Sequence, residues 1–418
     1  MSYPTTIIIC GITGDLAQKK IVPALFDLHQ KGKLGRDFRL VGFSRRDMSD
    51  IDLQAFIETI LSELDADCES AKDFISKFSY VSGQFDDSVS YKKLSEHLQK
   101  LDTDRGSCSN KLFYFSVPPS LYETLARHIS ESGLAVPCGG QNGFARILIE
   151  KPFGNDLSTA ERLDALLGEL FKEEQIFRID HYVAKQAVLD IINLHRRNKD
   201  FERKWNNQFI TKVEINLFEK SLVGSRGAFY DKVGTFRDVG QNHMLQMLSV
   251  VAMDIPKDNS AGNIQQSRAE VLEKLLPVDT ESLTNKMRRG QYVGYLSETG
   301  VELDSTTETF FSLTAFVDSE NFSGVPFVLS AGKALSKNLT EIVVHFKDWP
   351  KFVFNVPPEN SQPAYQKILL DCIAGDQTVF TSTREVLAEW RFVTPIVEKI
   401  KDQKPFPYKI GSHPEDLI

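Results

Sequence analysis

The residues from Arg178 to Lys185 place two cations, a carboxylate and an imidazole within eight positions, directly after a short strand-like run. The segment 183–193 has the apolar spacing of a helix, so His181, Tyr182 and Lys185 are expected beside a helix N-terminus. Free N–H groups and the helix dipole favour a phosphate or carboxylate at such a position. The pattern predicts a binding site for an anionic small molecule. The alternative is a buried structural ion pair beside a surface lysine.

His243 is a second residue whose type could support catalysis. It lies in a polar stretch, 236–248, that is flanked by apolar residues and is expected to be helical. An imidazole can act as a general base near neutral pH. A lone histidine among Met244 and Leu245 is more often a core residue, so the segment alone leaves both roles open.

Lys151 follows a predicted strand, 145–150, and precedes Pro152. Ligands bind at the carboxyl ends of parallel strands in open α/β sheets, so Lys151 is expected to point into such a crevice. The alternative is a solvated lysine in a turn at the end of the strand.

Gly11 and Gly14 lie between a β-branched run, 6–10, and an amphipathic helix. Glycines in this turn let backbone N–H groups approach a pyrophosphate, although the spacing is G-x-x-G-x-x-A and such turns are common. The next strand ends at Arg45 and Arg46, where an NAD site usually has an acidic residue. A guanidinium there can bind a 2′-phosphate, which favours NADP. A solvated arginine pair is the alternative.

The alternation of strands and helices predicts two domains. Residues 1–176 are expected to form an α/β Rossmann-like domain with a doubly wound parallel sheet, and 177–418 an α+β domain with a large, mainly antiparallel sheet. The expected strands are 6–10, 39–43, 111–117, 145–150, 209–217, 309–317, 327–330, 340–346 and 352–356. The expected helices include 53–64, 121–131, 226–251 and 267–278.

The composition is that of a soluble globular protein, with 418 residues, 41% hydrophobic residues and a formal net charge of −8. No apolar run has the length of a membrane span, and we expect a cytoplasmic protein without a membrane or nucleic-acid partner. The five scattered cysteines contain no C-x-x-C pair. This predicts reduced thiols, with neither a disulfide framework nor a metal site.

Several motifs occur in the order that is typical of glucose-6-phosphate dehydrogenases. The chain resembles this family in Gly11-x-x-Gly14-Asp15-Leu16-Ala17, Glu150-Lys151-Pro152-Phe153-Gly154, Arg178-Ile-Asp-His-Tyr-x-x-Lys185, Arg226-Gly-x-x-Tyr230-Asp231, Arg237-Asp238-x-x-Gln241-Asn242-His243 and Gly332-Lys333-x-Leu335. The resemblance extends from the N-terminus to about residue 400 and implies the same two-domain fold.

The resemblance also implies an activity: oxidation of D-glucose 6-phosphate to 6-phospho-D-glucono-1,5-lactone with hydride transfer to NADP, the first step of the oxidative pentose phosphate pathway. His243 would be the general base and Asp180 the carboxylate that orients it. The other implied contacts are His181, Tyr182 and Lys185 to the phosphate; Glu219, Asp238 and Lys333 to the sugar hydroxyls; Lys151 to both substrate and cofactor; and Gly11, Gly14, Asp15, Leu16 and Arg45 to the cofactor. The family's large sheet implies a homodimer or higher homo-oligomer.

The chain departs from the family pattern in three places. Ala184 and Gln186 flank Lys185 where the family usually has glycine and glutamate, and Asn338 replaces a second basic residue, with Lys337 one position early. The stretch 355–364 is shorter than usual. Two alternatives therefore stay open: a related hexose or hexose-phosphate dehydrogenase of altered specificity, and a non-catalytic nucleotide-binding paralogue.

Overall fold

The structure is a computed structural model that describes residues 4–35, 37–64, 68–140, 143–256, 258, 260–278, 283, 285–356 and 363–418. The chain forms two compact units. The first contains Met1–Phe153, Glu161–Ile179 and Gln362–Thr381, and the second contains Gly154–Ala160, Asp180–Ser361 and Ser382–Ile418. The units are thus interleaved along the sequence. The division into domains 1–176 and 177–418 stays a prediction.

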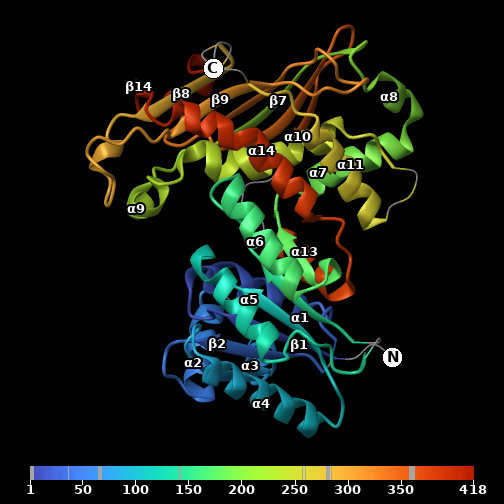
Figure 1. The fold of residues 1–418 in the computed structure, drawn as a ribbon, viewed down its shortest axis with the longest axis vertical. Coiled ribbons are helices and arrows are strands. Elements are labelled where there is room, and N and C mark those ends of the chain that lie inside the picture. The colour runs from blue at the N-terminus through green and yellow to red at the C-terminus, as the bar shows by residue number, and fades with distance from the viewer. Residues whose placement is uncertain are drawn as a thin grey trace. The chain divides into compact units, whose positions relative to one another are not determined.

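The first unit is built on a seven-stranded sheet of order β13-β6-β5-β4-β1-β2-β3, drawn mostly in blue and cyan in Figure 1. Its strands are β1 (Thr5–Cys10), β2 (Arg39–Ser44), β3 (Phe78–Ser82), β4 (Asn110–Phe115), β5 (Ala145–Ile149), β6 (Ile176–Ile179) and β13 (Phe380–Thr381). All of its neighbouring pairs are parallel except β13 with β6. Every residue of β1 is buried, as expected for a parallel strand that is covered on both faces.

Helices lie between the strands of this sheet along the chain, and α13 directly precedes β13. They are α1 (Val22–Gln30), α2 (Asp50–Ser62), α3 (Cys68–Ser76), α4 (Ser88–Arg105), α5 (Tyr122–Glu131), most of α6 (Leu157–Leu170) and α13 (Pro363–Ala374). A π-helical turn, η1 (Ala17–Ile21), precedes α1. Ser49 begins α2 with a reciprocal capping box to Asp52, which satisfies two backbone N–H groups at that helix end.

The second unit has a seven-stranded sheet of order β12-β11-β7-β10-β9-β8-β14. Its strands are β7 (Ile210–Phe218), β8 (Met287–Tyr292), β9 (Phe310–Ala315), β10 (Phe327–Gly332), β11 (Leu339–Phe346), β12 (Phe352–Asn355) and β14 (Phe406–Tyr408). The pairs are antiparallel except β7 with β10 and β8 with β14. The expected fold class, a Rossmann-like α/β domain with a mainly antiparallel α+β domain, is confirmed.

Helices lie along one face of this second sheet (Figure 1). They are α7 (Gln186–Arg197), α10 (Leu245–Ala252), α11 (Ala261–Glu273) and α14 (Thr383–Ile400), together with the short α8 (Lys199–Lys204) and α9 (Gly227–Tyr230). A π-helical segment, η6 (Phe236–Met244), leads directly into α10. It contacts both α14 and β10.

Several element boundaries differ from those expected. The predicted helix 226–251 is interrupted after α9, because Gly234 has a φ of +72° that a helix does not accommodate. The predicted helix 267–278 lies earlier in the chain, as α11, and ends at Glu273. The segment 183–193 becomes helical only at Gln186, because Lys185 has extended backbone torsions at the N-cap.

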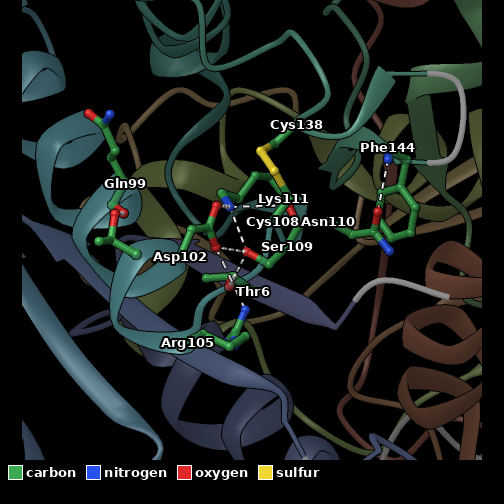
Figure 2. Close-up of a disulfide and its surroundings, with 11 residues drawn as sticks. Thr6, Gln99, Asp102, Arg105, Cys108, Ser109, Asn110, Lys111, Cys138 and Phe144 are labelled. Atoms are coloured by element: carbon green, nitrogen blue, oxygen red, sulfur yellow. Dashed lines mark hydrogen bonds and ion pairs between the residues drawn. A yellow bond between two sulfur atoms is a disulfide. The ribbon is translucent and has the colours of Figure 1, made fainter. Parts of the chain in front are cut away.

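Two cysteines contradict the prediction of reduced thiols. Cys108 and Cys138 form a disulfide with their Cα atoms 5.7 Å apart (Figure 2). Each lies shortly before one of two adjacent parallel strands, β4 and β5, so the sheet brings together cysteines that are 30 positions apart. Cys10 and Cys372 are free thiols, as predicted, and both are buried.

A polar network lies beside this disulfide (Figure 2). Lys111 Nζ is 2.7 Å from Asp102 Oδ2 and 2.6 Å from Ser109 Oγ, and Ser109 Oγ is 2.9 Å from Thr6 Oγ1. Burial lowers the pKa of Lys111, and the hydrogen bond to Asp102 opposes that effect. The disulfide therefore lies beside a buried lysine, Lys111, whose ammonium group is desolvated and paired with Asp102.

None of the helices in the described part of the chain combines the length and the hydropathy needed to cross a bilayer. Within the same ranges, no group of three or more His, Cys, Asp or Glu side chains is arranged to hold a metal ion.

Candidate active site

The predicted anion-binding segment forms a tight turn at the start of the second unit. Asp180 follows β6, and its Oδ1 accepts a hydrogen bond from the backbone N–H of Tyr182 at 2.9 Å. The N–H of Lys185 donates to the Tyr182 carbonyl at 3.0 Å, and α7 begins at the next residue. Asp180, His181, Tyr182 and Lys185 are each at most 4% exposed. The turn therefore gathers charged and polar side chains in a dry environment.

His243 and Asp180 are brought into direct contact, although they are far apart in sequence. His243 Nδ1 lies 2.8 Å from Asp180 Oδ1, with the two side chains 1% and 4% exposed. Burial by itself would raise the pKa of Asp180, but the charge and hydrogen bond of His243 lower it to about 2. Asp180 is therefore an anion at neutral pH. Because Nδ1–H donates to it, Nε2 carries the lone pair that can take a proton.

Aromatic rings fix the orientation of this imidazole. The Tyr182 ring stacks on His243 at 4.3 Å and 28°, and the His181 ring meets it edge-on at 4.5 Å and 70°. Lys185 Nζ lies 3.6 Å from the centroid of the Tyr182 ring, a cation–π geometry. The phenol ring thus separates the lysine cation from the imidazole and positions both.

The π-helical form of η6 determines which of its side chains share a face. In a helix with i→i+5 hydrogen bonds, residues five apart lie one turn apart. Asp238 and His243 have this spacing. An α-helix would rotate them by ~140° from each other. The π-helix therefore directs both predicted site residues to the same side of the segment.

The N-terminus of η6 is held by a buried carboxylate. Glu308 Oε1 accepts from the backbone N–H of Phe236 at 3.0 Å, and Glu308 Oε2 is 3.0 Å from Arg289 on β8. A carboxylate at a helix N-terminus satisfies an unpaired N–H group and is stabilised by the helix dipole. This contact fixes where the segment that carries His243 begins.

Glu219 and Lys333 form an ion pair at the carboxyl ends of two central strands of the second sheet. They directly follow β7 and β10, two parallel strands in which Phe218 is opposite Gly332. The next residue of each strand therefore lies beside the other. The pairing of a carboxylate with an ammonium gives one hydrogen-bond acceptor and one donor at the same edge, which suits recognition of hydroxyl groups.

Tyr230 joins this pair to Asp238. Lys333 Nζ lies 5.7 Å from the centroid of the Tyr230 ring. Burial raises the pKa of Tyr230, and the nearby Asp238 carboxylate adds to the effect. Lys333 and Asp238, two of the three side chains predicted to bind sugar hydroxyls, thus lie near one buried phenol, a role that the sequence motif containing Tyr230 did not reveal.

The residues that depart from the family pattern have local partners. Asn338 Oδ1 accepts from the backbone N–H of Lys220 at 2.7 Å, so it braces the segment that follows β7. Lys337 Nζ is 2.5 Å from Glu415 Oε1. Most of the shortened stretch lies outside the described residues.

The glycine turn of the first unit has the geometry of a phosphate-binding turn. Gly11 has a φ of +87°, and a Cβ added there would lie 2.3 Å from the Ser116 carbonyl oxygen. A cavity of about 270 Å³ at this turn is lined by Gly11, Gly14, Arg45, Arg46 and Ser116, among others. A different cavity, of about 370 Å³, does not include the turn. The buried Ser116 Oγ has no hydrogen-bond partner among the described residues. Glycine backbone, two guanidinium groups and an unsatisfied hydroxyl fit an anionic dinucleotide.

The other predicted cofactor residues lie in or near this turn. Asp15 is paired with Lys19 at 3.1 Å on the helix surface, and Leu16 is the N-cap of η1. Sequence reasoning assigned only Arg45 to the cofactor, but Arg46 lines the same cavity. The Tyr80 hydroxyl donates to the Arg46 carbonyl at 2.6 Å and so holds the end of β2.

Lys151 belongs to the first unit and follows β5. The Tyr114 hydroxyl donates to the Glu150 carboxylate at 2.6 Å, and the Tyr122 hydroxyl donates to the Glu150 carbonyl at 3.0 Å. The next peptide bond, Lys151–Pro152, is cis. The two tyrosines fix the backbone immediately before Lys151, whose contact with substrate and cofactor stays a prediction.

Family models match nearly all of the chain. Residues 8–190 match "Glucose-6-phosphate dehydrogenase, NAD binding domain", and residues 192–362 and 355–416 match "Glucose-6-phosphate dehydrogenase, C-terminal domain". These matches agree with the resemblance that the sequence motifs indicated.

Similar proteins share this assignment. A glucose-6-phosphate 1-dehydrogenase of Aggregatibacter actinomycetemcomitans is 35% identical, over 97% of this chain and 93% of the relative. One of Chlamydia muridarum is 33% identical over 98% and 93%, and the cytoplasmic isoform of Solanum tuberosum is 34% identical over 97% and 89%.

Solved structures agree with the fold as well. A glucose-6-phosphate dehydrogenase in complex with its substrate glucose-6-phosphate superposes with a TM-score of 0.90 at 27% identity, covering 99% of this chain and 95% of that one. The Mycobacterium avium enzyme gives 0.85 at 29% identity, covering 98% and 95%. The chain therefore belongs to the glucose-6-phosphate dehydrogenase family, whose members are oxidoreductases with a nicotinamide cofactor.

Proposed function

We propose that the chain oxidises D-glucose 6-phosphate at C1 to 6-phospho-D-glucono-1,5-lactone, with NADP as the hydride acceptor. The observation that carries this proposal is the buried contact of 2.8 Å between the Asp180 carboxylate and the His243 imidazole. It gives the site one base and one group that stabilises the base once it is protonated. The oxidation of a hemiacetal hydroxyl requires a base on the protein side, and a carboxylate beside the base stabilises its protonated form.

In the proposed reaction, His243 Nε2 removes the proton of the C1 hydroxyl as hydride leaves C1. Asp180 keeps Nδ1 protonated before the reaction and stabilises the imidazolium formed in it. A positioned base of this kind contributes about 10²–10⁴-fold to the rate. NADP, when bound, supplies the hydride acceptor.

The phosphate of the substrate is assigned to the turn that contains Lys185, His181 and Tyr182. This turn offers one ammonium, one imidazole and one phenol within five residues, all buried. Charge-assisted hydrogen bonds to phosphate are strong where water is excluded. Glu219, Lys333 and Asp238 are assigned to the sugar hydroxyls, and Lys151 to a bridge between substrate and cofactor.

NADP is preferred over NAD on the basis of the nucleotide cavity. Arg45 and Arg46 line it, and none of the described residues that line the cavity is acidic. A carboxylate at this place would recognise a ribose 2′-hydroxyl and repel a 2′-phosphate. Gly11, Gly14, Asp15 and Leu16 are assigned to the pyrophosphate turn.

A cytoplasmic location and a homodimeric or larger assembly are further parts of the proposal. The relative from Solanum tuberosum is described as a cytoplasmic isoform, which supports the first. Light scattering after size-exclusion chromatography measures the mass of the assembly. A mass of one chain, 47.2 kDa, would contradict the second.

The activity is tested by mixing purified protein with glucose 6-phosphate and NADP and following the absorbance of reduced nicotinamide. Reduction of NADP is expected, with much slower reaction when NAD or unphosphorylated glucose is supplied. Equal rates with glucose would support a related hexose dehydrogenase and contradict the phosphate assignment. No reduction with any hexose or hexose phosphate would support a non-catalytic paralogue.

A further inference from the structure

Glu389 is a buried carboxyl group near Asp180, the carboxylate of the proposed catalytic pair. It lies on α14 and is 2% exposed. Its Oε1 is 2.7 Å from Gln246 Nε2 on α10, and its Oε2 is 3.4 Å from Gln241 Nε2 on η6. Two glutamines from the helical run that carries His243 therefore converge on one side chain of another helix.

These two glutamines flank His243 in the sequence and are connected to it. Gln241 Oε1 is 3.4 Å from Asn242 Nδ2, and Asn242 Oδ1 accepts from the backbone N–H of His243 at 2.7 Å. Gln246 lies in the first turn of α10, directly beyond the π-helical segment. Glu389 thus contacts this helical run on both sides of His243. The two contacts span the position where the π-helix η6 continues as the α-helix α10.

The charged groups around Glu389 disfavour an ionised carboxylate. Asp180 and Glu385 are nearby anions, and Arg268 is the nearby cation. Arg268 is already in a buried ion pair with Glu385 at 2.7 Å. Burial raises the pKa of Glu389 well above its usual range, and the Asp180 charge raises it further. An additional anion here would be desolvated and without its own cation.

The hydrogen-bonding groups agree with a protonated acid. Gln246 Oε1 is buried and has no hydrogen-bond partner among the described residues. A carboxylate offers only acceptors, whereas a carboxylic acid also offers one O–H donor. Glu389 Oε1 and Oε2 accept from Gln246 Nε2 and Gln241 Nε2, and a carboxylic acid retains an acceptor lone pair on each oxygen, so both contacts are kept when Glu389 is protonated.

We propose that Glu389 is a positioning residue for His243, acting as an un-ionised carboxylic acid that binds Gln241 and Gln246 and holds the imidazole toward Asp180. The proposal rests on the proposed function, because it describes how the base of that reaction is oriented. It also explains how a second buried carboxyl group can lie close to Asp180 without adding a negative charge of its own.

The test compares Glu389→Leu, Glu389→Gln and a matched control, Glu398→Gln, which changes an exposed glutamate on the same helix. Glu389→Leu keeps a similar volume without hydrogen bonds. We expect its kcat to fall by about 10- to 100-fold, because small displacements of a catalytic group cost that much. Its KM for glucose 6-phosphate is expected to stay within about twofold, since ground-state contacts are retained.

Glu389→Gln retains a neutral group with a donor and an acceptor. We expect its kcat to stay within about threefold of wild type, and the acidic limb of its kcat/KM profile to stay at the same pH. If Glu389 were ionised, this substitution would remove an anion from the surroundings of His243. The acidic limb would then move to lower pH, and such a movement would overturn the proposal.

A kcat of wild-type size in Glu389→Leu would also overturn it. If Glu389→Leu does not fold, Gln241→Leu removes the same connection from the other helix and is expected to lower kcat in the same way; an unchanged kcat there would contradict the proposal. If the wild-type protein reduces no cofactor, the proposed function fails. In that case the infrared C=O band of a protonated carboxyl group, present in wild type and absent in Glu389→Gln, tests the assignment without turnover.

Discussion

The proposed base site and the proposed nucleotide turn differ in the groups that they would use to bind charged ligands. In the second unit, Asp180 and His243 are buried side chains in direct contact, 4% and 1% exposed. In the first unit, Gly11 acts through its backbone, and Arg45 is an exposed side chain near the Phe85 ring. Buried polar contacts are costly to disturb, whereas exposed charges are screened by solvent. Substitutions should therefore have large and specific effects at the proposed base site. At the nucleotide turn the effects should be smaller, except where a substitution alters the backbone shape.

The largest effect is expected for His243→Asn. Removal of the base should lower kcat by about 10²–10⁴-fold. The amide N–H can still donate one hydrogen bond to Asp180, so the fold and the KM for glucose 6-phosphate should change little. Steady-state kinetics with saturating NADP measures both constants. A kcat near that of wild type would mean that His243 is not the base.

The next largest effect is expected for Lys185→Met. Loss of a charge-assisted hydrogen bond to phosphate should raise the KM for glucose 6-phosphate by roughly 10- to 150-fold. The KM for NADP should not change. Lys199→Met, which alters an exposed lysine at the start of α8, is the matched control. An equal rise in both KM values would show that Lys185 does not act on the substrate phosphate.

Gly11→Ala tests the nucleotide turn. A Cβ there would lie 2.3 Å from Ser116 O, and the positive φ adds about 1–3 kcal/mol of strain. We expect weaker NADP binding and a lower free energy of unfolding, with kcat retained at saturating cofactor. Gly32→Ala is the control, because Gly32 has a φ of +64° but open space around its Cβ position. Equal losses of NADP binding and stability in both variants would show that the positive φ causes the effect and that the contact with Ser116 does not.

The smallest effect on turnover is expected for the double variant Cys108→Ser, Cys138→Ser. The free energy of unfolding should fall by about 2–4 kcal/mol, because the unfolded chain loses a cross-link. The kcat should be unchanged. Denaturant titrations with and without a thiol reductant measure the effect. The reductant should destabilise the wild-type protein but not the double variant. If the wild-type protein is equally stable with and without the reductant, it lacks the disulfide in solution.

The sequence predicted the parts of the molecule that local patterns determine. The apolar, β-branched run of β1 and the glycines after it identified a parallel strand followed by a nucleotide turn. The polar motifs at 178–185 and 237–243 identified the residues that the structure brings into contact. The sequence of β8, Met-Arg-Arg-Gly-Gln-Tyr, has no regular apolar alternation, and this strand was missed.

The remaining features depend on tertiary structure. The spacing of η6 does not distinguish i→i+4 from i→i+5 hydrogen bonds, so the shared face of Asp238 and His243 could not be predicted. The disulfide depends on the adjacency of β4 and β5. Glu389 could have been found, because Glu385, Glu389, Val393 and Ile396 have the spacing of one helix face, which predicts a carboxylate among core residues.

The most direct test of the account is a double-mutant cycle with Asp180→Asn, His243→Asn and the double variant, with kcat measured for all four proteins. If the carboxylate acts only through the imidazole, the double variant should be no slower than His243→Asn by more than about threefold. If the two single losses multiply in the double variant, Asp180 and His243 act independently, and the proposed base with its orienting carboxylate is wrong.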